Sequence, residues 1–147
     1  MTSDQRGQAG GLEGLVFGLL LFVVGTLVIT SVWGAVDAKF AAAQAAREAA
    51  RAYVESGGDG VTADAAARRA ATATLTGHHR VAGAEVALTG DDYRRCALVT
   101  YRVTVPVRVA IVPFIQRSTT GFRMSSVHSE RVDPYRSGVS GTANCQS

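Results

Sequence analysis

The chain has 147 residues, a formal net charge of +3 and a hydrophobic fraction of 47%. Its basic residues are almost all arginines interleaved with acids, and they form no dense basic stripe with aromatic rings. This pattern argues against nucleic acid as a partner. Outside the apolar segment near the start, the chain is long enough for one small domain with a modest core.

The first predicted element is a membrane-spanning segment. The run from Gly14 to Val36 contains no charged side chain. As a helix it would be about 35 Å long, which exceeds the roughly 30 Å of a bilayer's hydrocarbon core. Trp33 lies near its end, where an amphipathic ring suits the membrane–water boundary. We therefore predict a transmembrane segment over residues 8–36, preceded by a short polar leader over residues 1–7.

The helix is expected to continue beyond the membrane. Residues 37–55 are rich in alanine, the best helix former, and contain no helix breaker. A glycine-rich stretch over residues 56–60 then ends the helix. The sequence thus predicts one helix from about Leu12 to Glu55, whose second half has small faces that allow close packing.

A second, shorter helix and a set of strands are predicted next. The helix is expected over residues 63–75, with Thr62 as its N-cap. Residues 81–88, 99–109 and 119–131 alternate between apolar and polar side chains, as half-buried strands do. In the last of these strands the apolar parity changes, which predicts a bulge near Ser125 and Ser126. Pro106 marks an edge, a bulge or a break in the strand that contains it.

Together these elements predict an α+β fold. A transmembrane helix continues into a long helix, followed by a short helix and a three- to four-stranded antiparallel sheet. The apolar face of the sheet needs a cover, and the alanine-rich half of the long helix is the obvious one. The domain is expected over residues 37–135, with a flexible Gly/Ser-rich tail over residues 136–147.

The two cysteines, Cys96 and Cys145, allow two interpretations. Outside the cytoplasm they would form a disulfide that closes a loop of about 50 residues and contributes roughly 4 kcal/mol in the chain-entropy model. The alternative is a buried Cys96 and a free Cys145 in a mobile tail. The sequence has no CxxC pair, so a zinc or thioredoxin-type site is not supported.

The sequence contains no recognisable catalytic constellation. His78 and His79 fall in a predicted loop, where adjacent side chains point in different directions. His128 and Glu130 share one face of a predicted strand, where a polar pair is the simpler interpretation. The chain also lacks a Walker loop and the GxSxG and HExxH motifs. We therefore predict that it is not an enzyme and has neither a metal nor another cofactor.

Glu13 is the one candidate functional residue near the apolar run. A carboxylate at the edge of a membrane segment costs free energy unless it is paired or reaches water. It either has a functional partner or lies in the headgroup region, where the cost is small. Spacing alone does not choose between these two.

Three features of the first third of the chain resemble the TadE family of pilin-like subunits. They are the leader ending in Arg6-Gly7, the glutamate Glu13 before an apolar helix, and the segment AAREAAR over residues 45–51. Members of this family are pseudopilins of the Tad system, which assembles Flp-type pili. The resemblance implies a structural or assembly role, with pilin-like subunits, Tad-type membrane proteins and the lipid bilayer as partners.

The resemblance also implies a processing step. A prepilin peptidase would cleave after Gly7, so that Gln8 becomes the first residue, and Glu13 would pair with the free N-terminus of a neighbouring subunit. Glu13 would then be the sixth residue, one position later than the family pattern. Either the processing differs here or the chain stays uncleaved.

The expected location is the cell membrane, with a single pass. The resemblance implies a cytoplasmic N-terminus and an extracytoplasmic domain. The positive-inside rule, which compares Arg6 and the terminus with Lys39, Arg47 and Arg51, weakly favours the opposite orientation.

Two alternatives come from other functional classes. A small secreted binding domain could be released by signal peptidase near Ala43, where small residues form a suitable site. The apolar run is, however, longer than the roughly 7–15 residues usual for a signal-peptide core. The other alternative is an accessory protein of an enzyme or transporter, with a site completed by a partner.

Overall fold

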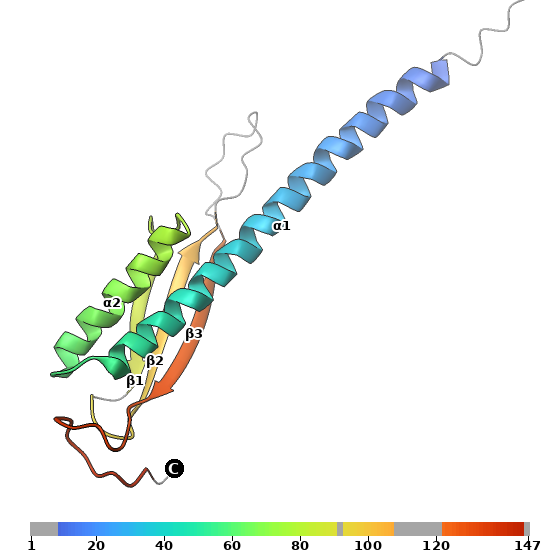
Figure 1. Ribbon diagram of the computed structural model, residues 1–147. Helices are drawn as coiled ribbons and strands as arrows, with labels where there is room; N and C mark the ends of the chain where they lie inside the picture. The colour runs from blue at the N-terminus through green and yellow to red at the C-terminus, as the bar shows by residue number, and fades with distance from the viewer. Residues whose placement is uncertain (1–8, 91–92, 108–121, 146–147) are drawn as a thin grey trace, which may run out of the picture.

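The computed structural model describes residues 9–90, 93–107 and 122–145. These form two helices, α1 (Ala9–Glu55) and α2 (Gly60–Gly77), and three strands, β1 (Glu85–Gly90), β2 (Leu98–Pro106) and β3 (Arg123–Arg131). Both helices cover one face of the sheet, and α1 continues far beyond it (Figure 1). The predicted α+β fold, with one long helix, one short helix and an antiparallel sheet, is confirmed.

Helix α1 is continuous, but its two halves have different surroundings. From Glu13 to Asp37 no side chain is buried, whereas Ala38 is fully buried. The buried positions then recur at alternating intervals of three and one, which places them on one face of the helix. They are Ala38, Ala41, Ala42, Ala45, Ala46, Ala49 and Ala50. The alanine-rich half therefore covers the sheet, as its small side chains predict.

Helix α2 packs beside the buried half of α1. Its buried residues are spaced by four and are again small, apart from the last: Ala63, Ala67, Ala71 and Leu75. The helix begins earlier than predicted, and Thr62 is not its N-cap. Asp59 caps it instead, because its carboxylate accepts a hydrogen bond from the backbone N–H of Thr62 at 2.8 Å.

The sheet has the order β1-β2-β3, and both pairs are antiparallel. The central strand β2 alternates as predicted, with one parity fully buried beneath the helices: Val99, Tyr101, Val103 and Val105. Pro106 ends β2 opposite Arg123. Its ring cannot donate a ladder hydrogen bond, which explains its place at a strand end. The predicted continuation to residue 109 lies outside the described residues after Val107.

The predicted bulge in β3 is wrong. Every residue of β3 has one partner in β2, from Arg123 opposite Pro106 to Arg131 opposite Leu98. The change of parity has a different cause. Val127 lies on the outer face of the sheet and is 46% exposed, while the inward positions next to α1 hold Ser126, His128 and Glu130. An edge strand has a half-buried inner face, so it tolerates polar residues there.

Candidate functional site

The exposed half of α1 is the most distinctive surface of the chain. Its large apolar side chains are open on all sides, with Phe22 72% and Trp33 74% exposed. Soluble proteins rarely leave so much contiguous apolar surface uncovered. Within the described residues, this one helix near the N-terminus is long and apolar enough to cross a membrane. The structure thus contains one helix that could serve as the predicted single-pass element, and it places neither end of that helix relative to a membrane.

The polar side chains within this apolar half are satisfied by the helix itself. The hydroxyl of Thr26 donates to the carbonyl of Phe22 at 2.8 Å, and that of Ser31 donates to the carbonyl of Leu27 at 2.8 Å. Thr30 makes the same kind of bond to the carbonyl of Thr26 at 3.0 Å. In hydrocarbon, where no water is present to take their hydrogen bonds, hydroxyl groups need such partners.

Glu13 lies near the start of the exposed half of α1 and is itself exposed. It makes no hydrogen bond or ion pair with any residue that the structure describes. The predicted cleavage residues, Gly7 and Gln8, lie outside the described residues. The structure therefore neither joins Glu13 to a partner nor tests the predicted cleavage.

Where the exposed half ends, α1 is tied to the rest of the domain by charged side chains. Arg80, in the loop after α2, donates to the carboxylate of Asp37 at 2.7 Å and reaches the carbonyl of Gly34 at 3.5 Å. Lys39 donates to the backbone carbonyl of Ser125 in β3. Sequence reasoning missed this junction. Its one visible signal is that Asp37 and Lys39 are the first charged residues after the apolar run.

A tyrosine cluster lies at the other end of the buried half of α1. The ring of Tyr53 meets those of Tyr93 and Tyr101 edge to face, with centroid distances of 5.2 and 5.8 Å. The hydroxyl of Tyr101 donates to the Asp64 carboxylate at 2.8 Å, and Arg68 pairs with the same carboxylate at 2.7 Å. Burial, together with this hydrogen bond, raises the pKa of Tyr101 well above its ordinary value.

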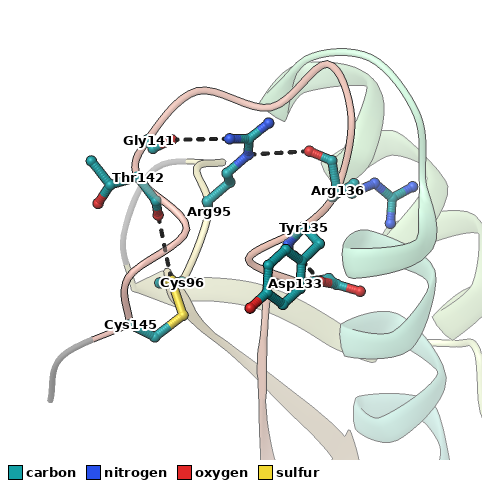
Figure 2. The surroundings of a disulfide bond; sticks show 8 residues. All are labelled: Arg95, Cys96, Asp133, Tyr135, Arg136, Gly141, Thr142 and Cys145. Atoms are coloured by element: carbon teal, nitrogen blue, oxygen red, sulfur yellow. Dashed lines mark hydrogen bonds between the residues drawn. A yellow bond between two sulfur atoms is a disulfide. The ribbon is translucent and has the colours of Figure 1, made fainter.

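The chain after β3 is attached to this far end of the domain. Cys96 and Cys145 form a disulfide, with their Cα atoms 5.2 Å apart. The Arg95 side chain donates to the carbonyls of Arg136 and Gly141 at 3.1 and 3.4 Å (Figure 2). Residues 136–145, predicted to be a flexible tail, thus have defined contacts.

Arg136 connects this tail to α1. Its guanidinium donates to the backbone carbonyls of Val54, Glu55 and Ser56. These carbonyls lie at the C-terminal end of α1, where the helix leaves such groups without an internal partner and where a positive charge is favoured. A residue 80 or more positions along the chain from the C-terminal end of α1 therefore caps it.

His78 and His128 lie on different elements and have different partners. His78 shares a hydrogen bond of 2.9 Å with the side chain of Gln44, and His128 lies 3.4 Å from the Glu130 carboxylate on the same strand. Among the described residues, no group of three or more His, Cys, Asp or Glu side chains is arranged to hold a metal.

Comparison with protein-family models, curated proteins and solved structures finds no match to this chain.

Proposed function

We propose that the chain is a membrane-anchored, TadE-like pseudopilin, a structural or assembly subunit of a Tad-type (Flp) pilus or a related secretion apparatus. One observation carries the proposal. A single uninterrupted helix has an exposed apolar first half and an alanine-faced second half packed under an antiparallel sheet. This is the arrangement expected of a subunit that is stored in a membrane and assembled through its helix.

The domain is proposed to lie outside the cytoplasm, with the N-terminus inside. The disulfide between Cys96 and Cys145 supports this orientation, because such bonds persist in oxidising compartments and are rare in the cytoplasm. This argument is independent of the positive-inside count, which favours the opposite orientation only weakly.

The alternative of a secreted domain released near Ala43 is disfavoured by the packing of α1. A cut there would remove Ala38, Ala41 and Ala42, which are fully buried. It would also remove Asp37, the partner of Arg80. The released domain would therefore expose apolar core and leave the Arg80 side chain without its carboxylate.

In the proposed function, Glu13 is the residue through which the anchor meets a neighbouring subunit. A carboxylate near the membrane surface of one helix has its best partner in a positive charge on another helix, such as a free N-terminus. Pilin-like subunits and Tad-type membrane proteins are the proposed partners, and a prepilin peptidase is proposed to process the leader.

The proposal is tested by deleting the gene in its native host and examining the cells for pili by electron microscopy. Deletion should abolish or strongly reduce piliation, and the wild-type gene should restore it. Glu13→Gln should fail to restore it, whereas Glu48→Gln, which changes an exposed carboxylate of the same helix, should succeed. Normal piliation in the deletion strain would refute the proposal.

Processing is tested separately by mass spectrometry of the mature protein from membranes. A chain that begins at Gln8 supports cleavage by a prepilin peptidase. An intact Met1 contradicts the processed form. A chain free in the medium that begins near Gln44 would support the secreted alternative instead.

A further inference from the structure

The end of the domain nearest the exposed half of α1 carries apolar side chains that the core does not use. Phe122, just before β3, is 71% exposed, and Val81, in the loop after α2, is 42% exposed. Figure 1 shows the end of α2 and the start of β3 at the end of the domain from which α1 departs. Two charged neighbours, Arg80 and Arg123, flank them in sequence. We call these four residues the anchor-proximal surface.

The loop part of this surface is level with the end of the apolar run. Arg80 is bonded to Asp37 at 2.7 Å and lies 3.5 Å from the carbonyl of Gly34. The apolar run ends between these two residues, at Val36. Val81 is therefore attached next to the point where α1 would leave a membrane.

The strand part of the surface reaches the same level. Lys39 of α1 bonds to the carbonyl of Ser125, and β3 runs away from the anchor in the same direction as α1. Phe122 lies three residues nearer the anchor, or about 10 Å along the strand. The same distance along α1 corresponds to about seven residues. Counted back from Lys39 toward the N-terminus, it places Phe122 level with the last turns of the apolar run. A hydrogen bond of 2.6 Å from the N–H of Val107 to its carbonyl fixes its backbone there.

These levels coincide with the headgroup layer of a bilayer. The run from Gly14 to Val36 would be about 35 Å long, and the hydrocarbon core is about 30 Å thick. The excess is about one turn of helix, and an exposed aromatic ring, which is favoured among the headgroups, assigns it to the last turn of the run. Trp33, which is 74% exposed, lies in this same turn.

We propose that the anchor-proximal surface rests on the membrane that α1 crosses, with Phe122 and Val81 inserted among phospholipid headgroups. This inference rests on the membrane anchoring in the proposed function. Arg123 would contact lipid phosphates. Its guanidinium is paired with Glu85 at 2.8 Å, but both side chains are exposed, so the pair holds it only weakly.

A bilayer fits this surface better than a separate protein does. The anchor of the same chain already holds the surface against the headgroups, so contact costs little additional translational freedom. A small apolar patch with an exposed arginine, too small for a stable protein interface, is sufficient under that condition.

The test places a single tryptophan at three exposed aromatic positions of the full chain. Trp33→Phe removes the native tryptophan, and Phe122→Trp, Phe22→Trp or Tyr135→Trp is then added. The three positions are 71%, 72% and 84% exposed, so each change is tolerated by the fold. Each protein is reconstituted in phosphatidylcholine–phosphatidylglycerol vesicles, and its fluorescence is measured with lipids brominated either near the headgroup or deep in the acyl chain.

The fluorescence of the F122W protein should be quenched by lipids brominated near the headgroup. Its emission maximum should lie at a shorter wavelength than that of the Y135W protein. The F22W protein should be quenched most by lipids brominated deep in the acyl chain, and the Y135W protein by neither lipid.

If the F122W protein is not quenched while the F22W protein is, the surface does not touch the bilayer and the inference is overturned. Protection of F122W from both bromolipids and aqueous iodide would also overturn it, since protein would then cover the site. If the F22W protein escapes quenching, the membrane anchor of the proposed function fails instead.

Discussion

At the scale of single residues, Tyr101 joins three elements of the fold. It lies on the buried face of β2, its ring contacts Tyr53 of α1, and its hydroxyl donates to Asp64 of α2. Its side chain is fully buried, so ionisation would place a negative charge away from water and beside a carboxylate. The neutral form is therefore strongly favoured in the folded chain.

This makes stability sensitive to alkaline pH. Folding raises the pKa of Tyr101. The contribution of the neutral Tyr101 side chain to the free energy of unfolding is therefore fully present below the pKa of tyrosine in the unfolded chain, which is about 10. Above that pH the unfolded chain loses a proton that the folded chain keeps, and the free energy of unfolding should fall by about 1.4 kcal/mol per pH unit. Urea unfolding of the full chain in detergent micelles between pH 8.5 and 11 measures this slope.

Tyr101→Phe should flatten the alkaline slope, because phenylalanine has no proton to lose. Tyr135→Phe is the matched control, since that ring is 84% exposed and folding changes its surroundings little. An unchanged slope in the Y101F protein would show that other groups cause the alkaline loss.

At the scale of elements, the domain is built on close contact between helix faces made of alanine. Ala63, Ala67 and Ala71 of α2 are fully buried on the side that packs against α1. Short side chains let the two helices approach closely, but they leave little space that can accommodate a larger group.

Ala67→Leu should therefore lower the free energy of unfolding by about 1–3 kcal/mol through overpacking. Ala65→Leu makes the same chemical change two residues away at an exposed position of the same helix and should alter it by less than about 0.5 kcal/mol. Equal effects of the two substitutions would mean that the interface between α1 and α2 is looser than described.

The elements also show what the sequence could predict. The apolar run, the alanine-rich continuation and the alternation in β2 are strong periodic signals, and each predicted its element. The predictions of the N-cap of α2 and of a bulge in β3 were wrong for local reasons. Asp59 and Thr62 are both good caps, and an edge strand such as β3 can turn polar residues inward without a bulge. The junction of Arg80 with Asp37 joins residues 43 positions apart, which no local pattern shows.

At the scale of the whole molecule, the disulfide holds the chain after β3 against the domain. It links residues 49 positions apart. Arg136, which caps the C-terminal end of α1, lies in the tail that this bond holds in place. In the chain-entropy model, a loop of this length contributes about 4 kcal/mol by restricting the unfolded chain.

Reduction of the disulfide should lower the free energy of unfolding by about this amount. The full chain is unfolded with urea in detergent micelles, with and without reductant. A Cys96→Ala, Cys145→Ala double variant, which has no thiols, controls for effects of the reductant itself. Identical transitions for the oxidised and reduced wild-type chains would show that the bond does not stabilise the domain.

The continuity of α1 has a mechanical consequence. No linker separates the anchor from the domain, so a change in the tilt of the anchor in the membrane moves the whole domain with it. From Val36 to Glu55 the helix rises about 28 Å. A tilt of the anchor by about 20°, usual for transmembrane helices, would swing the far end sideways by about 10 Å. The direction in which the disulfide end points is thus set by the tilt of the anchor.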